Sequence, residues 1–223
     1  PVLCYNWMVH FNWLRTSTST PIRGGATATG YNHEEFQRGP LTEHGEVEEG
    51  ALWDGLEYFL NAVIPVADEA GVKLAMHPDD PPLSPIRGIG RIMTSPENFQ
   101  RLLDLAPSPN NGITFCQGCF TEMGVDIPTT IHHFAAQGRV HFVHFRNLTG
   151  TAENFTESFH DEGKQDMYVA MKAYQDAGFD GPMRPDHAPT MEGEDNSRPG
   201  YAIQGRLLAV GYMKGLIEAI EKF

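Results

Sequence analysis

Four apolar runs decide the fold of this chain: Leu-Ala-Met-His77, Ile-Thr-Phe-Cys116, His-Phe-Val-His144 and Met-Arg-Pro-Asp186. Each run ends in a residue that can bind a metal ion, and between 28 and 42 residues separate each of these from the next. Those intervals have the length of strand–helix repeats. Because parallel strands end at one edge of their sheet, such repeats would bring two imidazoles, a thiolate and a carboxylate to one point. The runs therefore predict a metal site on a parallel sheet.

A helical pattern and then a glycine precede each run. Helices are predicted at about 48–71, 95–105, 128–138 and 167–177, with a last helix at 200–222. Pro65 is expected to kink or break the first of them. Strands are predicted at about 2–6, 72–77, 113–116, 140–145 and 182–186. Helix–glycine–strand units in succession are typical of the (β/α)8 TIM barrel, an α/β fold whose active site lies in the loops after the strands.

The length and composition fit a single domain over residues 1–223. The chain is 40% hydrophobic, which is enough for one sizeable core. Residues 16–50, rich in Thr, Ser and Gly and then in Glu, predict a long loop excursion. About five of the eight barrel strands are found, and the sequence opens directly in a strand. We therefore expect that residues before Pro1 supply the other three.

Net charge and cysteine content limit the classes of binding partner and the cellular compartment that we expect. The formal net charge of −13 argues against nucleic acid or an anionic membrane surface as a partner, although local arginines could still bind a small anion. No apolar stretch approaches the ~18 residues of a membrane span, and no signal peptide is recognisable. Three cysteines do not make a disulfide framework, so a reduced, cytoplasmic setting is expected.

The predicted ligands are His77, Cys116, His144 and Asp186, which suit Mn²⁺, Fe²⁺ or Zn²⁺. Four protein ligands alone would close a tetrahedral zinc site, whereas a larger shell with room for substrate oxygens favours Mn²⁺ or Fe²⁺. A single His or Cys at a strand end is more often structural than a metal ligand. Four such residues at the ends of successive strands indicate a metal site. Cys119 completes a CxxC with Cys116, but one such pair is weak evidence, and Cys119 is expected to be a loop residue.

Three further residues lie within two positions of a predicted ligand. Arg146 lies two residues beyond His144, on the same side of its strand, where a guanidinium could hold a substrate carboxylate or form a salt bridge at the barrel rim. Arg184 has the same two-residue spacing from Asp186, which it precedes. His187, directly after a predicted ligand, is a natural general acid or base near neutral pH.

Several motifs together resemble the mannonate dehydratases of uronate (glucuronate) catabolism, a family of metal-dependent TIM-barrel lyases. They are CYNWM at 4–8, WLRT at 13–16, LAMHPDDPP at 74–82, TFCQG at 114–118, HFVHFRN at 141–147, DMYVAMKA at 166–173, MRPDH at 183–187 and PGYAIQGRL at 199–207. They touch nearly every part of the chain outside residues 17–50.

The resemblance implies an activity, the loss of water from D-mannonate to give 2-dehydro-3-deoxy-D-gluconate. It implies the same four metal ligands, with Mn²⁺ or Fe²⁺ as the ion, and it puts His187 and Tyr201 at the acid–base positions without dividing the two roles between them. A divalent ion would stabilise the enediolate formed when C2 loses its proton, and an acid would protonate the departing C3 hydroxyl.

The resemblance also implies a small anionic sugar acid as substrate, with Arg146, Asn147 and Arg184 as the residues expected to contact it. The sequence does not decide whether the chain forms a homodimer. It departs from the family at Asn12, where an Asp is expected, and in the loop Ala-Pro-Thr-Met after His187.

Two alternatives stay open. One is another metal-dependent sugar enzyme, such as a xylose-isomerase-type barrel, although those sites use Glu and Asp where this chain has Cys116. The other is a homologue that binds metal without turnover.

Overall fold

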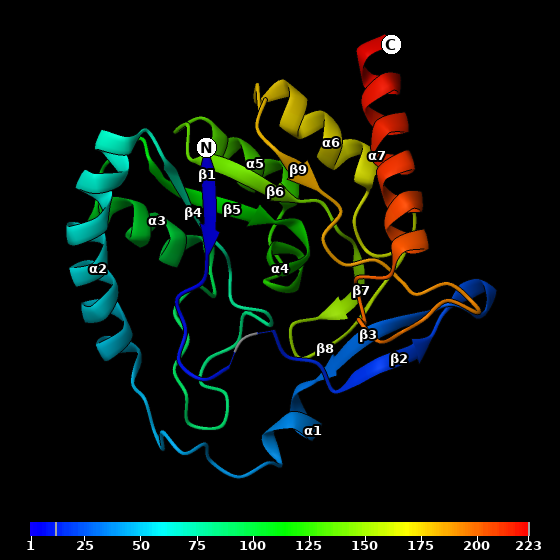
Figure 1. Ribbon diagram of the computed structural model, residues 1–223, viewed down its shortest axis with the longest axis horizontal. Coiled ribbons are helices and arrows are strands. Elements are labelled where there is room, and N and C mark those ends of the chain that lie inside the picture. Colours follow the sequence, from blue (N-terminus) through cyan, green and yellow to red (C-terminus); the bar gives the residue numbers. More distant parts are fainter. Residues whose placement is uncertain (12, 223) are drawn as a thin grey trace.

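A five-stranded parallel sheet carries the runs that end in the four predicted metal ligands. The computed structural model describes residues 1–11 and 13–222, so Asn12, the first departure from the family pattern, lies outside the described residues. The strand order is β1-β4-β5-β6-β9 and every pairing in this sheet is parallel, as predicted. The strands are β1 (Val2–Tyr5), β4 (Lys73–Met76), β5 (Asn111–Cys116), β6 (Val140–His144) and β9 (Met183–Arg184). The sheet forms half of a barrel wall, with α2 beside β1 and β4 in the view of Figure 1.

Helices connect these strands. The long ones are α2 (Glu49–Ala70), α3 (Pro96–Leu105), α5 (Ile127–Ala135), α6 (Met167–Asp176) and α7 (Ile203–Lys222). Helix α2 buries one face through Leu52, Leu56 and Leu60 and ends at Gly71, whose φ of 63° is the left-handed conformation that glycine adopts without strain. The helix runs on through Pro65 rather than breaking there. Because Pro65 is exposed, the carbonyl that loses its partner can be solvated.

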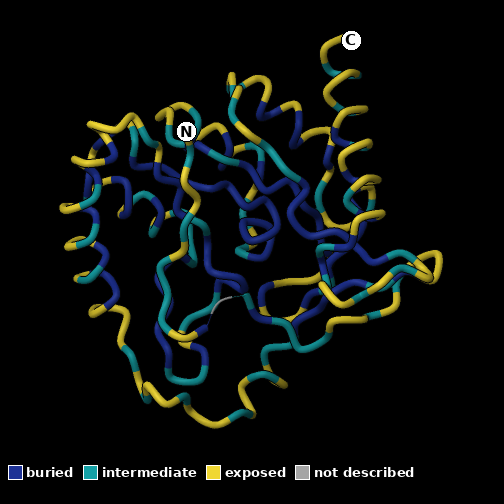
Figure 2. The backbone as a smooth tube through the Cα atoms, viewed as in Figure 1, coloured by how far each residue is buried: buried dark blue, intermediate teal, exposed yellow. Residues whose placement is uncertain are grey.

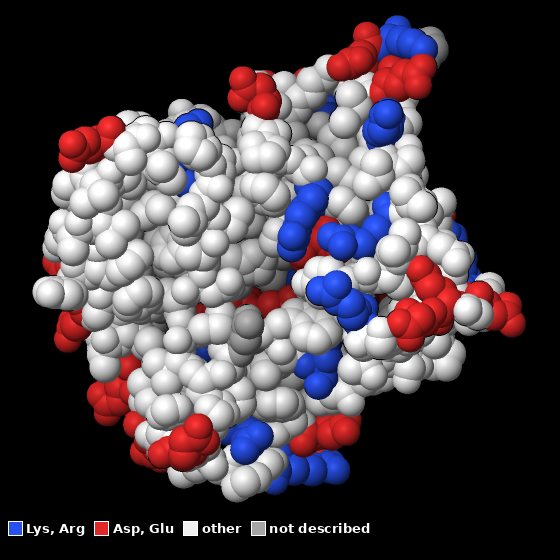
Figure 3. Space-filling view, in the orientation of Figure 1, with Lys and Arg blue, Asp and Glu red and all other residues white. Residues whose placement is uncertain are grey.

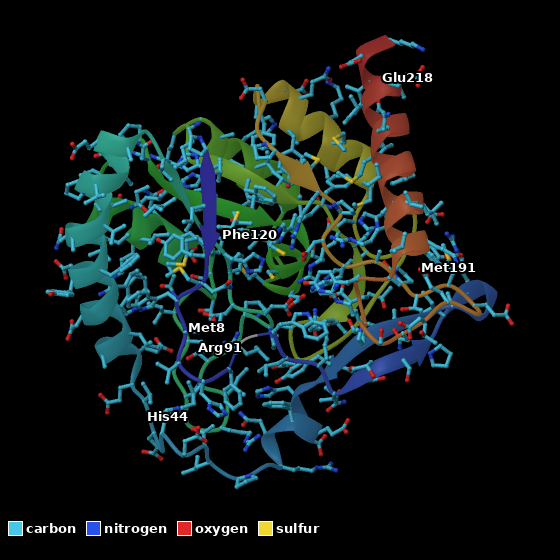
Figure 4. All side chains as sticks on the ribbon, in the orientation of Figure 1. Met8, His44, Arg91, Phe120, Met191 and Glu218 are labelled. Carbon is cyan, nitrogen blue, oxygen red and sulfur yellow. The ribbon has the colours of Figure 1, made fainter. Side chains whose placement is uncertain are left out.

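A short helix was not predicted. Helix α4 (Gln117–Glu122) starts directly after β5, and all six of its residues are buried. Phe120 of this helix stacks on Phe115 of β5, with ring centroids 4.3 Å apart, and lies against Phe99 and Phe134. This aromatic group belongs to the main core and fixes α4 beneath the ends of the strands (Phe120 is labelled in Figure 4).

The predicted loop at 16–50 is wrong in part, because it contains two strands and two short helices. They are β2 (Ser17–Pro21), η1 (Arg23–Gly25), β3 (Thr27–Asn32) and α1 (His33–Gln37). The two strands β2 and β3 join β7 (Leu148–Thr151) and β8 (Asn154–Glu157) in an antiparallel sheet of order β2-β3-β8-β7, seen below the parallel sheet in Figure 1. The Thr- and Ser-rich strands lack a regular apolar alternation, which is why they were not predicted. Apolar residues from distant segments, such as Phe155, cover them in the structure.

Burial separates the framework from its outer layer. The inner strands β4, β5 and β6 are largely buried, whereas the edge strand β1 and the outer faces of α2 and α7 are exposed (Figure 2). Among the described residues, no helix is both long and apolar enough to cross a membrane.

Candidate metal centre and acid–base pair

The four predicted metal-binding residues lie side by side at the carboxyl edge of the parallel sheet. Cys116, the last residue of β5, is in register with His144, the last residue of β6. His144 is in turn in register with Arg184, two residues before Asp186. His77 directly follows β4, which pairs with β5. Neighbouring strands therefore deliver all four side chains to one edge, as the sequence predicted.

Prolines fix where two of these strands end. Pro78 follows His77 and Pro185 precedes Asp186, and a proline nitrogen cannot donate to a strand ladder. Asp186 itself has a φ of 57°, in the left-handed region that non-glycine residues seldom adopt. This turn of the backbone directs the Asp186 carboxylate back towards the neighbouring strand end, where it contacts His144.

The donor atoms converge closely enough for one cation. His77 Nε2 lies 3.0 Å from His144 Nδ1, and His144 Nδ1 lies 3.5 Å from an oxygen of Asp186. With Cys116, all four donor atoms lie within 4.8 Å of one another. The carbonyl of Pro78 accepts from His77 Nδ1 at 2.7 Å, which leaves the Nε2 lone pair directed at the cluster. Two imidazoles, a thiolate and a carboxylate in this arrangement fit a divalent ion.

The protein environment favours the thiolate of Cys116. Burial opposes ionisation, but a hydrogen bond from the Cys119 thiol at 3.3 Å and the positive charges of Arg146 and His77 lower the pKa of Cys116 well below its usual range. Burial and the neighbouring Cys116 sulfur raise the pKa of Cys119 well above its usual range. The two cysteines therefore differ in kind: one is an anionic donor and the other a neutral thiol. Cys119 lies in buried helix α4, so the expectation of a loop residue is wrong.

Arg146 is buried and does not line the cavity that opens beside the donor residues. Its fully buried guanidinium contacts Glu157 at 2.5 Å, Asp80 at 2.8 Å and Glu122 at 3.2 Å, and its Nε lies 3.5 Å from Asp186. The contacts observed for Arg146 are those of a salt bridge, the alternative that the sequence left open. The bridge is in the protein interior rather than at the rim, because β8 and α4 both supply carboxylates to this strand end.

The two other residues expected to contact substrate, Asn147 and Arg184, lie in different environments. Asn147 holds a loop: its amide donates to the carbonyl of Gln165 at 2.9 Å and accepts from the backbone of Leu148 at 3.0 Å. It is not among the residues that line the cavity. Arg184 does line it, with a 42% exposed side chain that donates to Asp186 at 2.7 Å.

A cavity of about 140 Å³ opens over three of the four donor residues, His77, His144 and Asp186, while Cys116 is buried beneath them. Figure 3 shows acidic atoms in a depression near the centre of this face, with basic side chains around it. The cavity is lined by Asn6, Met8, Trp13, His77, Asp80, His144, Arg184, Asp186, His187 and Tyr201, of which Met8 is labelled in Figure 4. A pocket that joins several carboxylates and imidazoles to an exposed guanidinium suits a small anionic, oxygen-rich molecule.

His187 and Tyr201 form a hydrogen-bonded pair at the wall of this cavity. Nε2 of His187 lies 3.0 Å from the hydroxyl of Tyr201, and Nδ1 lies 3.0 Å from a carboxylate oxygen of Glu157. The indole of Trp13 packs edge-on against the imidazole at 5.3 Å. Burial, together with the charge of Asp186, raises the pKa of Tyr201. A protonated phenol and an imidazole in contact are groups that can exchange protons with a bound molecule.

Comparison with known proteins agrees with this geometry. Residues 1–41 and 37–223 match the model of the family D-mannonate dehydratase (UxuA). The chain is 40% identical over 245 residues to mannonate dehydratase 2 of Halalkalibacterium halodurans, covering 98% of this chain and 70% of that protein. It is also 40% identical over 256 residues to the mannonate dehydratase of Thermotoga maritima, covering 99% and 71%.

The chain belongs to the D-mannonate dehydratase family. The crystal structure of the mannonate dehydratase from Streptococcus suis superposes with a TM-score of 0.89 at 35% identity, over all of this chain and 66% of that one. The chain thus spans about two thirds of the length of its relatives. An L-ribulose 3-epimerase and a xylose isomerase domain protein from Planctomyces limnophilus also match, with TM-scores of 0.55 and 0.56, but at 15% identity they show only a shared fold.

Sequence reasoning missed part of this dehydratase-family site. Trp13, Arg15 and Asp80 lie within motifs that carry the family resemblance, and their motifs were the signal that could have found them. Glu157 lies in none of those motifs and belongs to the antiparallel sheet that was not predicted. It reaches His187 only because that sheet packs against the end of the barrel wall.

Proposed function

We propose that this protein dehydrates D-mannonate to 2-dehydro-3-deoxy-D-gluconate, with His77, Cys116, His144 and Asp186 as the ligands of a divalent ion. The single observation that carries the proposal is the convergence of these four donor atoms beside the His187–Tyr201 pair, in a chain of the mannonate dehydratase family. The ion is proposed to be Mn²⁺ or Fe²⁺, since substrate oxygens can complete a shell larger than four.

The substrate is proposed to lie in the cavity with its carboxylate towards Arg184. The Arg184 side chain is half-exposed, and its Nε has no hydrogen-bond partner among the described residues. When bound, a divalent ion supplies electrostatic stabilisation for the negative charge that develops beside the substrate carboxylate. The His187–Tyr201 pair removes the C2 proton and protonates the leaving C3 hydroxyl. The enol that results becomes the 2-keto acid by tautomerisation.

Turnover is tested directly by incubating the metal-loaded protein with D-mannonate and measuring the 2-keto-3-deoxy acid. His187→Asn and Tyr201→Phe should each lower kcat by roughly 100-fold or more, since general acid–base groups contribute on that order. Their metal content should stay at the wild-type value, because neither side chain is a proposed ligand. A metal-loaded protein that forms no keto acid from D-mannonate would refute the proposed activity.

A second candidate, a metal-dependent sugar isomerase or epimerase, is favoured only by the shared fold. The thiolate in the donor set and the family match both separate this chain from it. The same incubation distinguishes the two, because an isomerase would change a sugar without releasing water.

A further inference from the structure

Glu157 contacts the imidazole of His187 from the side away from the cavity. It is the last residue of β8, its side chain is only 3% exposed, and it does not line the cavity. Its Oε1 lies 3.0 Å from His187 Nδ1, while the opposite ring nitrogen faces Tyr201. The carboxylate, the imidazole and the phenol therefore form a line that runs from the protein interior to the cavity.

Two buried arginines keep this carboxylate charged. Arg15 and Arg146 each place a guanidinium nitrogen 2.5 Å from Glu157 Oε1. Burial opposes ionisation, but the charges of Arg146, His187 and Arg15 outweigh it and hold the pKa of Glu157 well below its usual range. An ionised carboxylate can only accept hydrogen bonds. The proton in the 3.0 Å contact must therefore sit on Nδ1 of the neutral imidazole, which leaves a lone pair on Nε2.

We infer that Glu157 is a positioning residue of the proposed dehydration: it holds His187 in the tautomer whose Nε2 accepts the C2 proton, with Tyr201 as the acid. The inference rests on the proposed function and deepens it. The ring is also held in place sterically, by the edge of Trp13 at 5.3 Å and the ring of Tyr201 at 5.2 Å. Once Nε2 is protonated, the negative charge of Glu157 stabilises the resulting imidazolium.

The proton balance closes on these two side chains. Nε2 of His187 takes the proton from C2, and the electron pair of that bond forms the enediolate. The pair then moves to form the C2–C3 double bond as the C3–O bond breaks. The leaving hydroxyl takes the Tyr201 proton and departs as water. The phenolate regains a proton from His187 Nε2–H across the 3.0 Å contact, which restores both groups for the next turnover.

Kinetics test the role with a matched control in the same buried cluster. Glu157→Leu removes the acceptor and the charge, so kcat should fall on the order of 100-fold while KM stays within about three-fold. Glu157→Gln can keep an oxygen towards Nδ1 but loses the charge, and it should recover roughly ten-fold of that loss. The control is Glu122→Gln, because Glu122 contacts Arg146 at 3.2 Å and not His187, and burial with the nearby Asp80 raises its pKa well above the usual range.

The control should retain wild-type kcat, and all three variants should retain wild-type metal content. A Glu157→Leu variant with unchanged kcat, or a Glu122→Gln variant that loses as much as Glu157→Leu, would overturn the inference. Either result differs from a failure of the proposed function, in which the wild-type protein itself would release no keto acid.

Nitrogen-15 NMR of the histidine rings tests the tautomer without any turnover or variant. In the Zn²⁺-loaded wild-type protein at neutral pH, the His187 ring should carry its proton on Nδ1, with Nε2 bare. If the neutral His187 ring carries its proton on Nε2, the inference is wrong regardless of the kinetic results.

Discussion

Replacing Arg146 should destabilise the whole fold, whereas replacing Arg184 should mainly weaken substrate binding. Each arginine lies two residues from a proposed ligand, Arg146 after His144 and Arg184 before Asp186, and the structure gives them opposite environments. Arg146 is fully buried among Asp80, Glu122 and Glu157, whereas Arg184 is 42% exposed and forms an ion pair with Asp186.

The magnitude follows from the contacts that Arg146→Met would break. Hydrogen bonds to charged groups are each worth about 1.5–3 kcal/mol. Arg146 makes three with carboxylates, at 2.5, 2.8 and 3.2 Å. They do not add fully, because the raised pKa of Glu122 lets that group be neutral and Arg15 still pairs with Asp80 and Glu157. The expected loss is therefore about 3–5 kcal/mol, the range for breaking a buried ion pair.

Urea unfolding followed by tryptophan fluorescence, with a chelator present, measures this loss without a contribution from metal binding. Arg184→Met should lose only about 0–1 kcal/mol, as expected for a partly exposed pair, while its KM for D-mannonate rises. If Arg146→Met loses less than about 1 kcal/mol, or if both variants lose the same amount, the distinction between a buried structural arginine and a cavity arginine is wrong.

Three further outcomes are expected. Cys116→Ala should abolish metal binding in a metal-content assay while Cys119→Ala retains it, and equal metal content in the two variants would refute the ligand assignment. Phe120→Ala removes a fully buried ring that stacks at 4.3 Å on its neighbour, so unfolding should become easier by about 3–5 kcal/mol, against almost no change for the 80% exposed Tyr58→Ala. Burial lowers the pKa of His141 to about 4 from its ordinary 6.5. The unfolded chain then takes up that proton first, and the free energy of unfolding should fall between about pH 6.5 and 4 by at most about 3 kcal/mol. This part of the pH dependence should be missing from His141→Phe.

Much of the parallel sheet could be read from the sequence because its signals are local. The apolar runs that end at His77 and Cys116, and the glycines that precede the strands, each act within a few residues. The antiparallel sheet escaped prediction because β2 and β3 show no regular apolar alternation in the sequence. Strand β3 pairs with β8, more than a hundred residues away, and Phe155 of β8 packs against Tyr31. Pro65 was expected to kink or break helix α2, but the helix continues through it on its solvent-exposed face.

The sequence by itself determined which side chains stand at the strand ends, and so predicted the four donors and His187. A parallel sheet puts every strand end at one edge, whatever the rest of the chain does. Only the tertiary structure decided that Arg146 points into the interior and that Glu157 lies behind His187. Both depend on β8 packing against the barrel wall, and contacts between segments so far apart in the chain leave no local pattern in the sequence.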